Sequence, residues 1–294
     1  MSEAKDDLKR EKVRIVPISN IEDFPDHPFQ VKDDESMDQL VESIRMNGVL
    51  NPVIALKIDE NHYQLISGHR RKHACILLGI DRIPLIGREM TKEEAVIEMV
   101  DSNLQREHIL PSEKARAYKM KMDAMKNQGK RTDLTSTPMA GKSKERETAS
   151  IIGSSNGESG DQVRRYIRLN ELTDELLEFV DEGKIGMRPA VELSYLQEDE
   201  MRDLVDFIDD EEVFPSHAQT IRMKVLSKEG KLDTEAIRDI MLEEKPNQRA
   251  KIKIPMERIE KYFPTGTSQQ QMEDTIVKAL AMYRQRQKEN RDAR

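Results

Sequence analysis

The chain has 294 residues, of which 35% are charged and 4% aromatic, and it contains no tryptophan. This length allows two or three domains, and the composition favours a helix-rich, modular protein over one with a single large β core. The single cysteine excludes a disulfide framework, and no apolar run is long enough to span a membrane, so we expect a cytoplasmic protein.

The net charge of −8 is distributed unevenly along the chain. Residues 103–170 carry 14 lysines and arginines against 8 acidic residues, whereas residues 171–245 carry 9 against 22. The flanking parts, 1–102 and 246–294, have net charges of −6 and +5. This asymmetry predicts a basic binding region beside an acidic one. The alternative is a solvated surface on which the charge blocks have no function.

Short strands and helices alternate in the first 110 residues. The pattern predicts strands at 13–18, 52–58, 63–66 and 83–86, and helices at 36–47, 72–78 and 92–103. Ser36 and Thr91 are candidate N-caps, and Glu94 would complete a capping box with Thr91. Two prolines place Ile21 to Gln30 in a loop, and the amide of Gln30 at its end is free to read a base edge.

A polar turn follows the third predicted strand and consists of Ser67, Gly68, His69, Arg70 and Arg71. A glycine at a strand-to-helix turn lets a backbone approach an anion closely, and the first free N–H groups of the helix point at that anion. Two arginines add bidentate phosphate donors. The turn therefore predicts a triphosphate site, although an ordinary turn with solvated arginines has the same residues.

A second polar stretch, Asp101 to Glu107, ends the predicted helix at 92–103. It brings the amide of Asn103, carboxylates and the guanidinium of Arg106, which together are the groups that hold a metal ion with its phosphates. We expect the two stretches to form one triphosphate pocket.

A helix-turn-helix pattern lies in the basic region. The predicted elements are a helix at 112–127, a flexible polar loop at 128–144, a short helix at 147–153, a turn at 154–159 and a helix at 161–169. The last helix turns Val163, Tyr166, Ile167 and Leu169 inward, and its other polar residues are candidates for DNA contacts: Gln162, Arg164, Arg165 and Arg168. Arginine and glutamine can bind guanine and adenine edges in the major groove. Any short helical hairpin can share this pattern, and the turn is longer than usual.

The remaining residues read as a helical support followed by a separate tail. Residues 171–243 predict short helices, residues 251–255 a short strand, and residues 272–283 a helix with one apolar face, which needs a partner and so implies dimerisation or docking. We divide the chain into a disordered start (1–12), an α/β domain (13–110), a helical helix-turn-helix domain (111–245) and a dimerisation or docking segment (246–294).

Several motifs in fixed order resemble the ParB/Spo0J/Noc (ParB/RepB/Spo0J) partition-protein family, in its plasmid or integrative-element version. The resemblance covers roughly residues 13–196 and rests on His27-Pro28-Phe29-Gln30, Glu42 to Pro52, Gly68-His69-Arg70-Arg71, Asn103-Leu104-Gln105-Arg106-Glu107, Ser112 to Tyr118, the helix-turn-helix and Glu182-Gly183-Lys184-Ile185. It implies an α+β fold in which a sulfiredoxin-like nucleotide-binding domain precedes an all-helical DNA-binding domain.

The resemblance also implies a function. In this family the Gly-x-Arg-Arg turn holds CTP, the segment from Asn103 to Arg106 supports Mg²⁺ and phosphate, with Asn103 as the metal contact, and Gln30 lies near the nucleotide. A homodimer binds a palindromic double-stranded DNA site, and CTP closes it into a sliding clamp. A ParA-type Walker ATPase is the usual partner, and the protein is associated with the nucleoid or a plasmid.

Two residues depart from the family pattern. His69 and Ser102 each stand where the family usually has glutamate, and the second of those glutamates helps to hold the metal and to position water. Asp101 is adjacent, but one residue on a helix turns its side chain by about 100°. These departures argue against efficient CTP hydrolysis and leave at most a weak CTPase, while binding remains expected.

Two other classes of function stay open. The sulfiredoxin fold and ParB-related serine kinases use ATP on a similar domain, but sulfiredoxin needs a cysteine where this chain has Gly68, and Cys75 lies further along the helix, where a buried structural thiol is expected. A transcriptional regulator without CTP would use the same helix-turn-helix.

Overall fold

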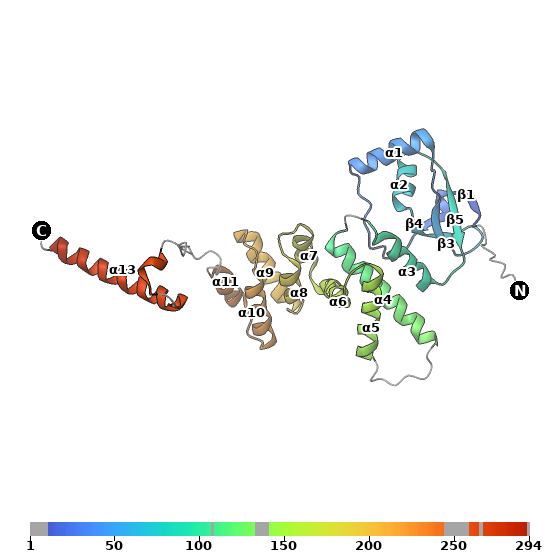
Figure 1. The fold of residues 1–294 in the computed structure, drawn as a ribbon. Coiled ribbons are helices and arrows are strands. Elements are labelled where there is room, and N and C mark those ends of the chain that lie inside the picture. The colour runs from blue at the N-terminus through green and yellow to red at the C-terminus, as the bar shows by residue number, and fades with distance from the viewer. Residues whose placement is uncertain (1–10, 107–108, 133–140, 244–258, 265–266, 293–294) are drawn as a thin grey trace, which may run out of the picture. The chain divides into compact units, whose positions relative to one another are not determined.

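We describe a computed structural model of the chain, in residues 11–106, 109–132, 141–243, 259–264 and 267–292. The chain forms two compact units, which divide between Glu243 and Glu244 (Figure 1). The predicted disordered start at 1–12 lies almost wholly outside the described residues, as does the predicted strand at 251–255. Among the residues described, no helix is long and apolar enough to cross a membrane.

The first unit begins with a mixed five-stranded sheet of order β1-β5-β3-β4-β2. The strands are β1 (Val13–Pro17), β2 (Ile21–Asp23), β3 (Val53–Lys57), β4 (Tyr63–Ser67) and β5 (Arg82–Arg88). β1 with β5 and β3 with β4 run antiparallel, whereas β2 with β4 and β3 with β5 run parallel. Four strands confirm the sequence prediction. β2 corrects it, because the first three residues of the predicted loop pair with β4 and form an edge strand.

Alternating side chains give the sheet a core on each face, as the period of two requires. Val53, Ala55 and Leu65 pack on one face with residues of α1 (Glu35–Asn47) and α2 (His69–Leu77). Leu56 and Ile66 point to the opposite face and pack with Ala95 and Met99 of α3 (Lys92–Asn103). The helices α2 and α3 therefore approach the end of β4 from opposite faces of the sheet.

The helix ends refine the sequence prediction. Asp34, not Ser36, caps α1, because its side chain accepts a hydrogen bond from the N–H of Met37 at 2.9 Å. The capping box of Thr91 and Glu94 is confirmed. α2 begins at His69, three residues before the predicted start, so the polar turn itself forms the first turn of the helix.

The rest of the first unit is helical. The helices are α4 (Pro111–Thr132), α5 (Gly141–Ser155), α6 (Gly160–Arg168), α7 (Asp174–Asp181), α8 (Met187–Leu193), α9 (Glu198–Glu211), α10 (His217–Lys228) and α11 (Thr234–Leu242). The flexible loop predicted at 128–144 is wrong at both ends, because α4 continues through Thr132 and α5 starts at Gly141; residues 133–140 lie outside the described residues. Glycine and polar residues lower helix propensity without excluding a helix, so composition alone does not set these helix ends.

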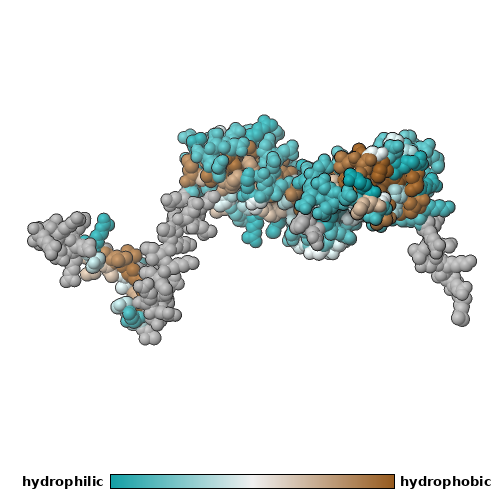
Figure 2. Space-filling view, turned by 90° about the horizontal axis from the view of Figure 1, so that it is seen from above, coloured by the Kyte–Doolittle hydropathy of each residue, from teal (hydrophilic) through white to brown (hydrophobic). Residues whose placement is uncertain are grey.

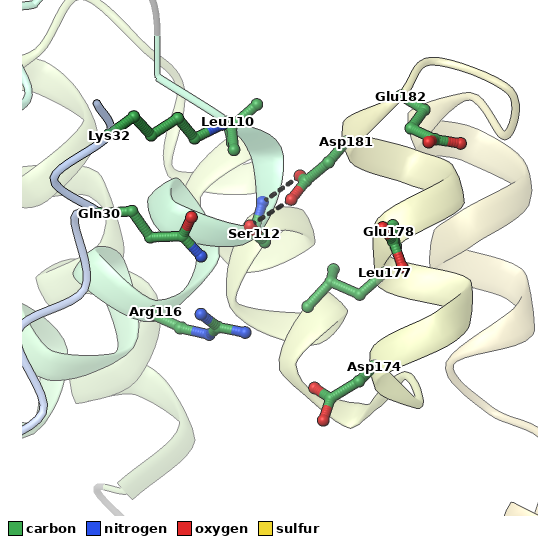
Figure 3. A pocket seen from close by; sticks show the side chains of 10 residues that line it. All are labelled: Gln30, Lys32, Leu110, Ser112, Arg116, Asp174, Leu177, Glu178, Asp181 and Glu182. Carbon is green, nitrogen blue, oxygen red and sulfur yellow. Dashed lines mark hydrogen bonds between the residues drawn. The ribbon is translucent and has the colours of Figure 1, made fainter. Parts of the chain in front are cut away.

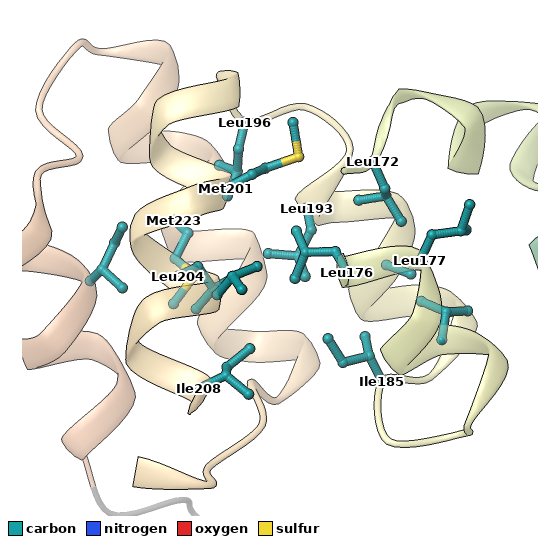
Figure 4. Packing of buried hydrophobic residues seen from close by; sticks show 14 of the residues in the cluster. Leu172, Leu176, Leu177, Ile185, Leu193, Leu196, Met201, Leu204, Ile208 and Met223 are labelled. Atoms are coloured by element: carbon teal, nitrogen blue, oxygen red, sulfur yellow. The ribbon is translucent and has the colours of Figure 1, made fainter. Parts of the chain in front are cut away.

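Helices α7 to α11 share one apolar core (Figure 4). Leu176 of α7, Leu193 of α8, Leu204 of α9 and Met223 of α10 are fully buried in it. α9 places most of its carboxylates on the opposite, exposed side, with Asp206, Asp209 and Asp210 among them, while Glu200 is buried. The acidic residues of this region are therefore the solvated side of a helical support.

The second unit contains a short 3-10 turn, η4 (Glu260–Tyr262), and one long helix, α13 (Gln269–Asp292). Val277, Leu280, Met282 and Tyr283 on this helix are exposed. Figure 2 shows hydrophobic surface on this unit. The helix has the unpaired apolar residues that the sequence indicated.

Candidate functional site

A cavity of about 440 Å³ lies where the first turn of α2 meets the last turn of α3. Its lining residues are Ser36, Leu40, Ser67, Gly68, His69, Arg70, Arg71, Ser102, Asn103 and Arg106. These include every predicted nucleotide-site residue except Gln30. Gln30 lines a cavity of about 950 Å³ that shares Ser36, Arg70 and Arg106 with the first. The structure thus brings the two polar stretches together.

Gly68 shapes the turn at the base of this cavity. Its φ angle is +108°, and a Cβ atom there would lie 2.6 Å from Cγ1 of Val53. No other residue type fits both the dihedral angle and the space. The first intrahelical hydrogen bond runs from the Lys72 N–H to the Gly68 carbonyl at 3.0 Å, so the N–H groups before Lys72 have no intrahelical acceptor. An anion in the cavity would meet these donors and the positive end of the helix dipole.

The two arginines of the turn have different surroundings. Arg71 donates from Nη1 to the carbonyls of Asn51 and Pro52, at 2.6 and 2.7 Å, and burial lowers its pKa. Arg70 donates from Nη2 to Oγ of Ser36 at 2.6 Å, while its buried Nε has no hydrogen-bond partner among the described residues. Arg71 therefore secures the loop before β3, whereas Arg70 retains a donor for a ligand.

Arg106 brings a second guanidinium to the cavity and lies 5.6 Å from the ring centroid of Phe29. Desolvation lowers the pKa of Arg106, the Glu113 carboxylate opposes this shift, and the charge of Arg70 adds to it. Arg70 and Arg106 both line the cavity, so two like charges face a common space. A bound polyanion would relieve their repulsion.

His69 is only 6% exposed, and both of its ring nitrogens lack a hydrogen-bond partner among the described residues. Its ring stacks on that of His27 with a centroid distance of 3.7 Å. Burial and the nearby His27 lower the pKa of His69 to about 3, so its imidazole is neutral near pH 7. Buried polar atoms without partners are rare in native proteins, and these two fit a ligand that offers a donor or an acceptor.

The last turn of α3 contributes polar oxygens and no carboxylate. Asn103 is 3% exposed and donates from Nδ2 to the Met99 carbonyl at 2.7 Å, which leaves its Oδ1 free for another contact. Ser102 also lines the cavity. Asp101 lies outside it and pairs with Lys121 of α4. None of the lining residues is acidic, so Mg²⁺ would fit here only with phosphate oxygens as its main ligands.

Among the described residues there is also no group of three or more His, Cys, Asp and Glu that could hold a metal ion by itself. The cavity thus provides an anion site formed by two guanidiniums, a helix N-terminus and a neutral imidazole. Its donor set fits a polyphosphate better than an isolated cation.

A third cavity, of about 500 Å³, lies between the loop at Gln30 and helix α7 (Figure 3). Figure 3 shows Lys32 and Arg116 across from Asp174 and Glu178. Asp181 bridges this space, because its carboxylate accepts hydrogen bonds from the N–H and Oγ of Ser112 at 2.9 and 2.5 Å. The start of α4 is therefore fixed to the end of α7.

The helical hairpin α5–α6 is closely packed. A Cβ atom on Gly153 would lie 2.6 Å from the Glu158 carbonyl oxygen, and one on Gly160 would lie 2.9 Å from the Ser150 nitrogen. Ser159 caps α6 through a hydrogen bond from the Gln162 N–H, and Val163 is fully buried. Two glycines thus set the close approach of α5 to the turn and to α6.

The four predicted DNA contacts differ in what their side chains already bind. Gln162 and Arg165 are exposed. Arg164 pairs with Asp161 on the same helix. Arg168 donates from Nε to Ser194 Oγ at 3.0 Å and from Nη2 to the Ser194 carbonyl at 2.5 Å, and its guanidinium lies 4.2 Å from the ring centroid of Tyr195. Arg168 joins α6 to the end of α8, which sequence spacing did not indicate.

A comparison with protein families assigns the first part of the chain. Residues 2–104 match the family model described as the ParB N-terminal domain. The chain carries a ParB N-terminal domain. The family resemblance derived from the motifs is thereby confirmed for this part of the chain, and the ParB fold of its α/β domain with it.

Named relatives of this ParB-domain protein include the nucleoid occlusion protein of Listeria innocua, which is 28% identical over 200 residues, 67% of this chain and 63% of that protein. Stage 0 sporulation protein J of Bacillus subtilis is 30% identical over 185 residues, 62% of this chain and 57% of that protein. The matches span about three-fifths of each relative's length. A crystal structure of C-terminally truncated ParB from Caulobacter crescentus, complexed to the centromeric parS site, is 22% identical, with 74% of this chain and 99% of that chain covered and a TM-score of 0.41.

Sequence reasoning missed the residues that connect the ParB domain to the helical hairpin. Glu113 accepts hydrogen bonds from the N–H groups of Gln30 and Leu110 at 2.8 and 3.2 Å. Lys114 pairs with Glu158 in the α5–α6 turn, and the Tyr118 hydroxyl donates to the same carboxylate at 2.9 Å. Burial and Glu158 raise the pKa of Tyr118. The sequence feature that could have indicated these contacts is the presence of charged residues of α4, such as Glu113 and Lys114, on a helix that also packs against the rest of the fold.

Proposed function

We propose that this chain is a ParB-type protein that binds CTP in the cavity between α2 and α3 and binds double-stranded DNA through α5–α6. The observation that carries the proposal is the pairing of Arg70 and Arg106 around a glycine turn, in a cavity without any lining carboxylate. Such a site suits three consecutive phosphates. The choice of cytidine rests on the family resemblance of the motifs.

Each residue of the cavity has a distinct role in this proposal. The N–H groups at the start of α2 and the guanidiniums of Arg70 and Arg106 bind phosphate oxygens, and Arg71 keeps the turn in place through the carbonyls of Asn51 and Pro52. The neutral imidazole of His69 hydrogen-bonds the ligand without adding negative charge. Mg²⁺, held by Asn103 together with phosphate oxygens, would offset phosphate charge.

Hydrolysis of CTP is slow or absent in this proposal. No carboxylate lines the cavity that could hold a metal ion or orient a water molecule. Ser102 occupies the position of the family glutamate, and Asp101 cannot replace it because its carboxylate pairs with Lys121. Nucleotide exchange, rather than cleavage, would then reopen the site.

DNA binding relies on exposed polar side chains of α6. Gln162 and Arg165 are exposed and would contact base edges, with Arg164 next to them, while Arg168 supports the hairpin from behind. A homodimer would place two such hairpins on a palindromic duplex. We further propose that CTP closes two copies around DNA, that a ParA-type Walker ATPase is the partner, and that the protein is associated with the nucleoid or a plasmid.

The enzyme alternative has little support from the surroundings of the cysteine. Cys75 is buried, and burial raises the pKa of its thiol, which disfavours the thiolate that a sulfiredoxin-type reaction needs. Gly68 occupies the position next to His69 where that chemistry would need the thiol. A regulator without CTP would bind DNA equally well in the absence and presence of nucleotide.

Site-specific crosslinking of two copies on a closed DNA circle tests the proposal. CTP should trap the wild-type protein on the circle, whereas Arg70→Ala should lose trapping and still bind its site. Arg45→Ala is the matched control, because Arg45 is exposed, pairs with Glu42 on the same helix and does not line the cavity. If Arg70→Ala is trapped as well as the control, the site has been assigned to the wrong residues.

A further inference from the structure

Lys121 is a charged residue in an unusual position on α4. Its side chain is only 5% exposed, and its Nζ pairs with Oδ1 of Asp101 on α3. The same Nζ lies 3.3 Å from Oγ of Ser155 at the end of α5. One ammonium group thus connects three helices.

Burial of this ammonium is costly for a purely structural contact. A buried charge loses its hydration, and a single partly exposed carboxylate compensates only in part. The neighbours of Lys121 on the same side of α4, Ala117 and Ala124, are apolar and buried, so a methionine of similar length would fill this space without that cost. The charge therefore calls for a role beyond packing.

The two partners of Lys121 each lie beside a functional element. Asp101 directly precedes Ser102 and Asn103, which line the cavity. Ser155 lies two residues after Gly153, at the point where α5 approaches the turn to α6. A displacement of the last turn of α3 moves the carboxylate that compensates the Lys121 charge. Lys121 must then either follow that carboxylate or lose its contact with α5.

We propose that Lys121 is a positioning residue that couples occupancy of the α2–α3 cavity to DNA binding by α5–α6. This inference rests on the proposed function of both sites. Because coupling between two binding sites is reciprocal, CTP changes DNA affinity by the same factor by which DNA changes CTP affinity. Removal of the Lys121 charge lowers this factor without touching either ligand.

The test is a thermodynamic cycle on the full-length chain. The DNA dissociation constant is measured with and without saturating CTP and Mg²⁺, on a duplex that the wild-type protein has selected from a random-sequence library. For wild type we expect CTP to change this constant by at least about fivefold, the lower end of typical coupling. For Lys121→Met we expect a change of less than about twofold, with unaltered affinity for CTP in the absence of DNA.

Lys126→Met is the matched control. Lys126 also lies on α4 and joins it to α5, through an ion pair with Glu145 at 2.7 Å, but it is partly exposed, and among the described residues its ion pair is to α5 and not to α3. It should keep the wild-type coupling factor. Ser155→Ala provides a second, milder variant that keeps the ion pair with Asp101 and removes the hydroxyl that Lys121 contacts, together with the local hydrogen bonds of that hydroxyl to Ile152 and Asn156. It should reduce the factor as well, and thermal melting verifies that each variant is folded.

The outcomes separate this inference from the function on which it rests. Absence of CTP binding by the wild-type protein would overturn both. CTP binding without any effect on DNA affinity would overturn the coupling alone, and so would a wild-type coupling factor in folded Lys121→Met or, if that variant does not fold, in Ser155→Ala. An equal loss of the coupling factor in Lys126→Met and Lys121→Met would contradict a specific role for Lys121, because any contact between α4 and α5 would then have the same effect.

Discussion

The cavity at α2 and the helical hairpin at α5–α6 both depend on glycines, but they use their cations differently. In the cavity, Gly68 adopts a left-handed angle, and Arg70 and Arg106 line the same space, close enough for the charge of Arg70 to lower the pKa of Arg106. In the hairpin, Gly153 and Gly160 permit close helix packing, and two of the four basic or amide side chains already have partners within the chain. The cavity therefore presents its cations to a small anion. The hairpin presents few side chains without a partner, so its DNA binding depends on how the fold positions α6.

The sharpest way to break this comparison is to change Gly68. Gly68→Ala should destabilise the folded state by about 3 kcal/mol, since the left-handed angle and the contact with Val53 add together. Gly79→Ala is the control, because Gly79 has a φ of +67° with no atom within 4 Å of the added Cβ, and it should cost about 1 kcal/mol. Urea unfolding measures both, and equal losses would mean that the close approach at Gly68 is unimportant.

The two arginines of the turn should separate binding from stability. Arg70→Ala should weaken CTP binding by about a hundredfold with little change in melting temperature, since a charge-assisted phosphate contact is lost. Arg71→Ala should lower the melting temperature as well, because the carbonyls of Asn51 and Pro52 lose their donor. Fluorescence titration with a labelled CTP and thermal melting give the two quantities. A lower melting temperature in Arg70→Ala, together with unchanged melting and weaker CTP binding in Arg71→Ala, would contradict the roles assigned to these residues.

His69 makes the stability of the sheet domain depend on pH. Its folded pKa of about 3 lies below the unfolded value of about 6.5, so the unfolded state binds the proton more readily and stability falls as pH falls below 6.5. Between pH 7 and pH 5 this group alone should remove about 2 kcal/mol of unfolding free energy. His69→Gln should flatten that part of the profile in urea unfolding experiments. An unchanged profile would show that His69 is not buried as described.

The smallest expected effect is on DNA binding by the hairpin and comes from the loss of the contact that Arg165 would make with a phosphate or a base. Arg165→Ala should weaken DNA binding by about tenfold and, if the contact is to a phosphate, should reduce the salt dependence by about one unit of slope. Arg168→Ala should instead reduce stability, because Arg168 holds the end of α8 and stacks on Tyr195. Fluorescence anisotropy at several salt concentrations distinguishes the two. A lower salt slope in Arg168→Ala with unchanged melting would contradict the assignment.

The sequence predicted the features that follow from local rules. Alternation placed four of the five strands, the capping box of Thr91 and Glu94 was recognised, and the two polar stretches were expected to meet. The short strand β2 was missed because it depends on pairing with β4, and two prolines nearby suggested a loop. The extension of α4 and α5 into the expected loop was missed because glycines and polar residues in the sequence suggested a loop, although they do not exclude a helix.

Residue roles that depend on tertiary contacts could not be derived from spacing. Arg168 was grouped with the exposed residues of α6, and only the fold shows that α8 accepts its guanidinium. Helical geometry did turn Asp101 away from the cavity, but nothing in the sequence named Lys121 as its partner 20 positions later. Long-range ion pairs require the path of the chain in three dimensions.

Calorimetric titration of CTP into the full-length protein, with and without a duplex selected by the protein itself, tests the central claim most directly. We predict saturable binding of CTP at one site per chain in the presence of Mg²⁺, much weaker binding of ATP, and loss of the CTP signal in Arg70→Ala. Absence of CTP binding under both conditions, or equal binding by Arg70→Ala, would contradict the account.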